Sequence, residues 1–149
     1  MAVQFRQLEL LHKIEKDKEN EFASNLQSAQ SFYEATKTKL TEVQGYKLDY
    51  LKKLQSMGSE GLVGQNYQHY QRFITQLEEG INAQVNAMNT AKQVVEQRRL
   101  IWVEQHTKVK AVETVLANKK QKHQQVMDKY EQNLADEFAS QKYIREQRT

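Results

Sequence analysis

The chain contains no proline anywhere in its 149 residues. Average usage of about 5% would supply roughly seven prolines, and each would interrupt a helix or a sheet ladder. Other turn-forming residues are also scarce, since there are 5 glycines against 20 glutamines. Because a sheet protein needs a turn about every ten residues, the composition predicts an all-α fold built from long helices.

Helix-breaking residues cluster at one place only. Gly58, Gly61 and Gly64 lie within seven residues of one another, a density of glycine found nowhere else in the chain. We therefore predict a loop at 58–64 that joins a helix over about residues 3–57 to a helix over about residues 65–145. The two helices are expected to form a single domain covering 1–149.

Apolar residues on both sides of this loop recur at alternating steps of three and four, the repeat of a coiled-coil seam. In the first helix the seam passes through Phe22, Leu26, Ala29, Tyr33, Thr36, Leu40, Val43, Lys47, Tyr50, Leu54 and Met57. In the second helix it passes through Tyr67, Tyr70, Ile74, Leu77, Ile81, Gln84, Met88, Ala91, Val95, Arg98, Trp102, Gln105, Val109, Val112, Leu116, Lys119, His123, Val126 and Tyr130. Few globular helices keep one register for so long. The pattern predicts a long antiparallel two-helix coiled-coil hairpin.

Folding such a hairpin about the loop fixes which residues face each other. Partners should have residue numbers that sum to about 122 in an antiparallel pair. Leu8 and Leu11 would then meet Val112 and Leu116, although the register also crosses Glu15 and Lys18 near the N-terminus. Residues beyond about 120 have no partner in the first helix, so a C-terminal helical overhang is expected on a thin rod.

Two glycines lie inside the predicted helices at nearly one level of the hairpin, Gly45 and Gly80. Each costs about 1 kcal/mol relative to alanine in a helix interior. Either the two backbones approach closely there, or the hairpin bends, or the two glycines are tolerated independently.

Residues suited to catalysis or metal binding are absent or scattered. There is no cysteine, which excludes disulfides and thiolate sites. His12, His69, His106 and His123 lie far apart in sequence, without zinc-site spacing. The glycine loop also lacks the Gly-Lys-Ser/Thr ending of a phosphate-binding loop. We expect no catalytic residues, no metal and no cofactor.

Charge and hydropathy argue against nucleic acid as a partner and against insertion into a membrane. The 22 basic and 19 acidic residues give a net charge of +3, and the local excess of basic residues over 92–122 suits an acidic surface better than nucleic acid. No stretch has the roughly 20 apolar residues of a membrane span, and the N-terminus lacks a signal peptide. We expect a cytoplasmic protein that binds no nucleic acid and does not insert into membranes.

Several segments together resemble the FliJ family of flagellar type III export proteins over essentially the whole chain. They are Leu8–Leu11 (LELL), Tyr46 with Tyr50, residues 66–81 (NYQHYQRFITQLEEGI), residues 95–102 (VEQRRLIW) and residues 130–139 (YEQNLADEFA).

The resemblance implies a non-enzymatic stalk that enters the hexameric export ATPase ring, promotes ring assembly, and contacts the export gate membrane protein and export chaperones. It implies a cytoplasmic protein recruited to the inner face of the membrane at the flagellar base, serving flagellum assembly, motility and chemotaxis, and a monomer in isolation. The end that enters the ring corresponds to Leu8, Leu11, Lys119, His123, Val126 and Tyr130. The gate-binding patch corresponds to Phe73, Leu77, Gly80 and Gln84, whose spacing places them on one helical face.

Two other functions fit the same pattern. One is the equivalent stalk of a virulence-type secretion system. The other is a generic coiled-coil scaffold, in which two hairpins share their seams as a four-helix dimer.

Overall fold

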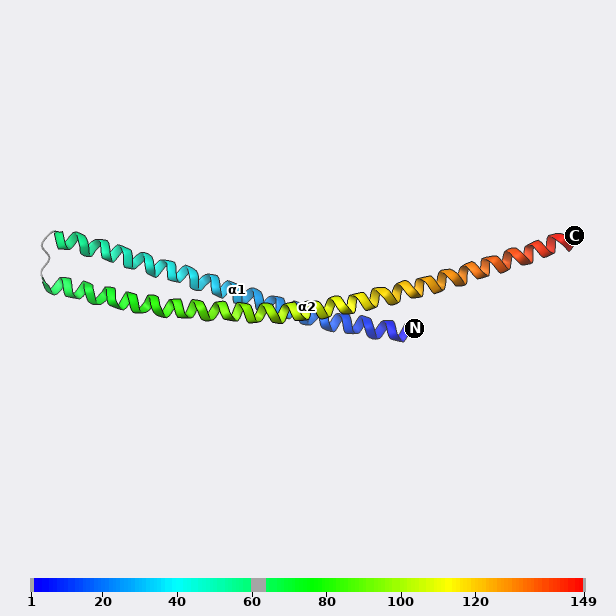
Figure 1. Cartoon of the computed structure of the whole chain (residues 1–149), viewed down its shortest axis with the longest axis horizontal. Helices are drawn as coiled ribbons and strands as arrows, with labels where there is room; N and C mark the ends of the chain where they lie inside the picture. Colours follow the sequence, from blue (N-terminus) through cyan, green and yellow to red (C-terminus); the bar gives the residue numbers. More distant parts are fainter. Residues whose placement is uncertain (1, 60–63, 149) are drawn as a thin grey trace. The chain divides into compact units, whose positions relative to one another are not determined.

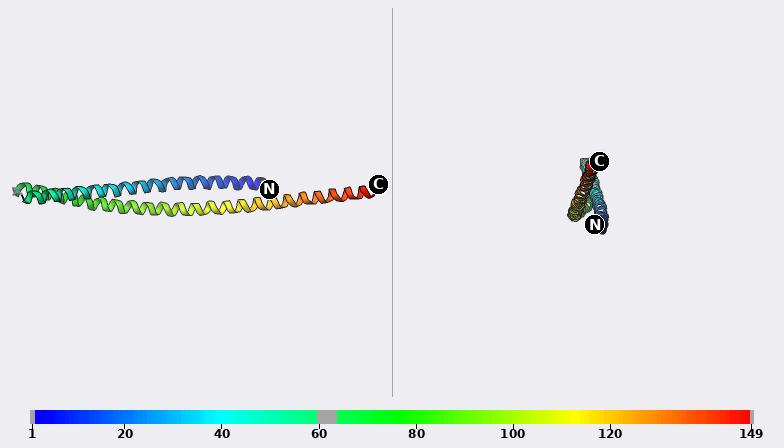
Figure 2. Two further views of the ribbon diagram at one scale, coloured as in Figure 1. Left: turned by 90° about the horizontal axis from the view of Figure 1, so that it is seen from above. Right: turned by 90° about the vertical axis from the view of Figure 1, so that its right-hand side faces the viewer.

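The computed structural model describes residues 2–59 and 64–148. They form two helices, α1 (Ala2–Ser59, 58 residues) and α2 (Gly64–Arg148, 85 residues), and these ranges contain no strand. The helices pack against each other and run antiparallel (Figure 1), and further views agree that they lie side by side (Figure 2). The prediction of an all-α helical hairpin is confirmed.

The helices extend into the region predicted as the loop. Gly58 is helical near the end of α1, and Gly64 is the first residue of α2. Gly61 and the rest of 60–63, where the turn was predicted, lie outside the described residues.

Both helices contribute to two compact units. Unit 1 combines the N-terminal residues up to Glu19 with the residues from Gln105 onward, and unit 2 spans Asn20–Glu104. Helix α1 and helix α2 each continue across the boundary between units without a break in helical structure.

Unit 2 has a narrow apolar core drawn from both helices. Its most buried apolar side chains are Leu40 (9% exposed) and Leu54 (8%) from α1, with Ile74 (7%) and Ala91 (3%) from α2. Other seam side chains of this unit are half-buried, because one helix can cover its partner on one side only: Phe22, Leu26, Ala29, Tyr33, Val43, Lys47, Tyr50, Met57, Tyr70, Leu77, Ile81, Gln84, Met88, Val95 and Trp102. Tyr67 and Arg98 occupy seam positions but are exposed.

The core of unit 1 is more polar than that of unit 2. Val109 is 1% exposed, yet the next most buried residues are polar, namely Gln105 (5%) and Glu19 (6%). On the α2 side Val112 and Leu116 are half-buried.

The α1 seam in unit 1 departs from the predicted seam at two positions, where His12 and Glu19 face inward in place of Leu11 and Lys18. The inward positions are Phe5, Leu8, His12, Glu15 and Glu19. Leu11 is 42% exposed, and Lys18 is exposed. Both choices use steps of three and four, but only the observed one keeps their alternation through Phe22 and Leu26. The observed one gives His12 and Glu19 ionic partners on α2.

Contacts across the helices lie close to the expected register. Glu15 faces Gln105 in unit 1, and Thr36 faces Gln84 in unit 2, so that each pair of numbers sums to 120. A Cβ atom built on Gly45 or on Gly80 would have no neighbour within 4 Å. A close approach of the backbones at these glycines is therefore excluded.

Helix α2 continues past the beginning of α1. The Phe5 ring lies against His123, with centroids 5.6 Å apart in an edge-to-face arrangement. All described side chains from 124 to 148 are exposed, and this part of α2 extends beyond the N-terminal end of α1 (Figure 1).

Candidate functional site

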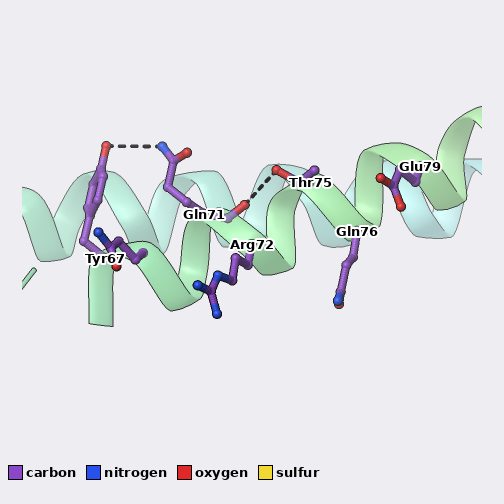
Figure 3. A pocket seen from close by; sticks show the side chains of 7 residues that line it. Tyr67, Gln71, Arg72, Thr75, Gln76 and Glu79 are labelled. Atoms are coloured by element: carbon purple, nitrogen blue, oxygen red, sulfur yellow. Dashed lines mark hydrogen bonds between the residues drawn. The ribbon is translucent and has the colours of Figure 1, made fainter. Parts of the chain in front are cut away.

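A shallow polar hollow lies on the described surface near the start of α2 (Figure 3). Its lining residues all come from this one helix: Tyr67, Gln68, Gln71, Arg72, Thr75, Gln76 and Glu79. The Gln71 amide donates to the Tyr67 hydroxyl at 3.3 Å, and the Thr75 hydroxyl donates to the Gln71 main-chain oxygen at 3.0 Å. A face of this kind offers amide hydrogen bonds to a partner, but no nucleophile with an adjacent base.

The four histidines do not converge. His69 is exposed and His123 packs on Phe5, whereas the other two face carboxylates on the opposite helix. His12 Nε2 lies 3.2 Å from Glu113 Oε1, and His106 Nδ1 lies 3.0 Å from Glu19 Oε1. Within residues 2–59 and 64–148, no group of three potential metal ligands comes together.

These two histidine–carboxylate pairs were missed by the sequence argument, which treated the histidines as scattered. Separations of 101 and 87 residues hide both pairs from any local motif. The antiparallel register would have revealed them, because the numbers in each pair sum to 125, close to the expected level.

Both carboxyl groups are held in the ionised form. The hydrogen bond from His106 lowers the pKa of Glu19, burial opposes this shift, and Lys16 supports it. The hydrogen bond from His12 lowers the pKa of Glu113, again against desolvation and with help from Lys110.

Phe73, the first residue of the expected gate-binding patch, sits on an aromatic cluster in unit 2. Its ring lies 4.4 Å from the ring of Tyr50 on α1, and it remains 37% exposed. Tyr70 lies 6.4 Å from the same tyrosine, and the Lys53 ammonium lies 5.5 Å from the centre of the Tyr50 ring. Phe73 therefore packs against Tyr50 while part of its ring stays exposed to solvent, and the Lys53 ammonium lies near the same tyrosine.

The other three patch residues differ in accessibility. Gly80 is exposed and Leu77 is half-buried. Gln84 is half-buried as well, and its amide donates to the main-chain oxygen of Thr36 at 3.2 Å. The four residues share a side of α2, but Leu77 and Gln84 point into the seam rather than away from it.

The six residues expected at the ring-entering end all belong to unit 1. Leu8 and His123 are half-buried and Lys119 is exposed. Leu11 is 42% exposed, Val126 is 58% exposed and Tyr130 is 59% exposed.

The sequence argument ended the seam at Tyr130, but exposed apolar residues continue along α2. Leu134 is 48% exposed and Phe138 is 71% exposed. Together with Val126 and Tyr130 they recur at steps of four, which places all four on one side of the helix. The same spacing, followed further along the sequence, would have identified them.

No helix of the described residues is long and apolar enough to cross a membrane.

Comparison with family models matches residues 4–148 to the family described as Flagellar FliJ protein. Comparisons with curated proteins and with solved structures found no significant match. The family match spans nearly all of the 149 residues and confirms the resemblance predicted from the sequence segments. The chain therefore belongs to the FliJ family and is a component of the flagellar protein export apparatus.

Proposed function

We propose that this protein is a non-enzymatic stalk of the flagellar export apparatus. The free end of α2 and the start of α1 enter the hexameric export ATPase ring and promote its assembly and activity. The same protein contacts the export gate and export chaperones, in the cytoplasm at the inner face of the membrane at the flagellar base.

The observation that carries this proposal is the apolar side of α2 that α1 does not cover. Val126, Tyr130, Leu134 and Phe138 are each about half exposed or more, and they lie in a segment where every described side chain is exposed. A contiguous apolar strip on a soluble helix marks a surface that a partner covers. A ring that encloses the helix would cover such a strip from outside.

The proposed mechanism is mechanical coupling rather than chemistry. A helix with one apolar side and one polar side presents different contacts to successive subunits of a ring. The ring state that binds the apolar side best is favoured, and by reciprocity each ring state favours one orientation of the helix. The ATPase hydrolyses ATP, and the stalk changes the relative populations of the ring states.

Contact with the export gate is proposed for unit 2. The exposed edge of Phe73 rests on Tyr50, with Lys53 close to the same aromatic ring. An aromatic side chain already held by packing loses little conformational freedom on binding, which makes it a suitable anchor. Gly80 leaves open space on the same side of α2.

The test is the hydrolysis rate of the export ATPase with and without added stalk. The full chain should stimulate hydrolysis while showing no activity alone, and a chain that lacks residues 121–149 should fail to stimulate while still binding the gate protein.

A sharper variant keeps the helix and replaces only its apolar side, as Tyr130→Ser, Leu134→Ser and Phe138→Ser. Its matched control replaces residues of the opposite side, as Gln121→Ser, Gln125→Ser and Gln132→Ser. Stimulation retained by the truncated chain or by the apolar-side variant would contradict the proposal.

The identity of the partners is tested separately. The tagged protein would be retained on resin from its native lysate at stated salt, since exposed ionic contacts weaken with salt, and the bound proteins identified by mass spectrometry. Recovery of a flagellar export ATPase or gate protein supports the stalk. Recovery of virulence secretion components alone would replace it with the related system.

A further inference from the structure

The first part of α1 is attached to α2 in an unusual way. We use the name N-terminal clasp for residues 5–19 of α1, which belong to unit 1. Its inward positions are Phe5, Leu8, His12, Glu15 and Glu19. Three of these five are polar, whereas Leu10 and Ile14 point outward with 59% and 44% of their surface exposed. The clasp thus turns three polar side chains toward α2 alongside Phe5 and Leu8, and it leaves Leu10 and Ile14 exposed to solvent.

Ionic and polar contacts hold the clasp. Besides the His12–Glu113 and His106–Glu19 pairs, the Gln105 amide donates to the main-chain oxygen of Glu15 at 2.9 Å and also to its carboxylate. The charged or titratable groups that face these contacts are His12, Glu15, Lys16, Lys18 and Glu19 on α1, and His106, Lys110 and Glu113 on α2.

The stability of these contacts depends on the partners of the buried Glu19 carboxylate staying in place. Glu19 is only 6% exposed, and its Oε2 has no hydrogen-bond partner among the described residues, with the Lys16 ammonium 3.5 Å away. A buried charge is tolerated only while its partners remain in place, and losing one partner is strongly destabilising. In unit 2 the seam is mainly apolar, and the Lys47–Glu78 ion pair across the helices is solvent-accessible, as the His12–Glu113 pair also is. The buried charge of Glu19 is what distinguishes the clasp.

We propose that the N-terminal clasp is a releasable element: it opens from α2 as one segment when Glu19 and Glu113 are protonated, while unit 2 stays paired. Opening uncovers Val109, Val112 and Leu116 on α2. The apolar side of α2 beyond His123 then continues back to Val109. The clasp thereby sets how much of the apolar side of α2 is accessible.

The direction of the pH effect follows from the two carboxyl groups. Folding lowers the pKa of Glu19 and of Glu113 below their ordinary value of 4.5. Their pairing therefore contributes its full stability above about pH 4.5 and loses it as the pH falls through the lowered values. Once Glu19 and Glu113 are neutral, they no longer supply negative charge to the two pairs across the helices.

Spin-label distances test this in the full chain, which contains no cysteine of its own. The clasp pair is Gln7→Cys with Ala117→Cys, and the control pair within unit 2 is Gln30→Cys with Asn89→Cys; all four positions are exposed and uncharged. From pH 7 to about pH 2.5, below the lowered pKa values, the clasp pair should gain a population at longer distance while the control pair keeps its distribution. Loss of one charged hydrogen bond corresponds to roughly a tenfold change in the opening equilibrium.

The same label pairs in a second variant test whether the response comes from the two carboxyl groups. With Glu19→Gln and Glu113→Gln, the longer clasp distance should be present at pH 7 already and should no longer respond to acid. Three results would overturn the proposal: an unchanged clasp distance at about pH 2.5, equal lengthening of both label pairs, or wild-type pH behaviour of the double glutamine variant.

Discussion

Gln84 on α2 donates its side-chain amide to the main-chain oxygen of Thr36 on α1, with 3.2 Å between Nε2 and O. Thr36 is 6% exposed, and its own hydroxyl donates back to the Tyr33 carbonyl at 2.6 Å. A polar residue in a coiled-coil seam fixes register when its hydrogen bond is satisfied across the helices. We predict that Gln84→Ala lowers the free energy of unfolding by about 1 kcal/mol, measured by urea denaturation followed by circular dichroism.

The matched control for this change is Gln76→Ala on the exposed side of α2. It makes the same chemical change and brings the same gain in helix propensity, but removes no contact across the helices. Its unfolding free energy should stay within about 0.5 kcal/mol of wild type. Equal effects of the two variants would show that the Thr36 contact contributes nothing.

Phe73→Ala is predicted to weaken binding of the export gate protein. Its exposed edge supplies the aromatic anchor, so the dissociation constant should rise about tenfold or more, while helix content changes little because Phe73 flanks the seam. The measurement is titration calorimetry with the soluble part of the gate protein. Tyr67→Ala removes another exposed ring near the start of α2 and should leave the affinity unchanged; an unaltered affinity of Phe73→Ala would remove this residue from the binding patch.

The absence of proline, the single glycine cluster and the apolar periodicity were together sufficient to predict the two helices and their antiparallel pairing. A repeat of three and four requires only that apolar residue types recur, as Leu40, Leu54 and Ile74 do. To choose between neighbouring residues, the alternation must be followed strictly along the whole seam, and from Leu26 and Phe22 it leads to Glu19 and His12. Near the N-terminus Leu11 was assigned to the seam because its side chain is apolar. In the structure the adjacent His12 faces inward instead, where it pairs with Glu113 on α2.

Accessibility of the candidate binding residues was harder to predict for the same reason. Gln84 has the spacing of a surface patch, but its amide is engaged by Thr36 on the other helix. Such a contact depends on the exact level at which two distant segments meet. The strip that ends with Leu134 and Phe138 was predictable in spacing, and its lack of cover agrees with the expectation that residues beyond about 120 have no partner in α1.

Val109→Ala is predicted to destabilise unit 1. Val109 is 1% exposed, and truncating a buried aliphatic side chain loses transfer free energy and leaves a cavity, for a cost of roughly 1–2 kcal/mol. Val115→Ala makes the identical change on the same helix at a position that is 45% exposed. Amide hydrogen exchange resolved along the chain should show weaker protection of α1 residues 5–19 in the first variant and little change in the second. Matching protection in both variants would contradict the burial of Val109 by the clasp.

Replacing the two interior glycines should stabilise the hairpin. Gly45 and Gly80 both lie within continuous helix, and a methyl group at either position would meet no atom within 4 Å. Alanine removes backbone freedom from the unfolded chain and improves helix propensity, so each change should add up to about 1 kcal/mol to the unfolding free energy. The midpoint of thermal unfolding should rise in each single variant and further in the double variant, because the two sites do not share a contact. An unchanged or lower midpoint for Gly45→Ala would mean that the helix uses this glycine for a bend that alanine resists.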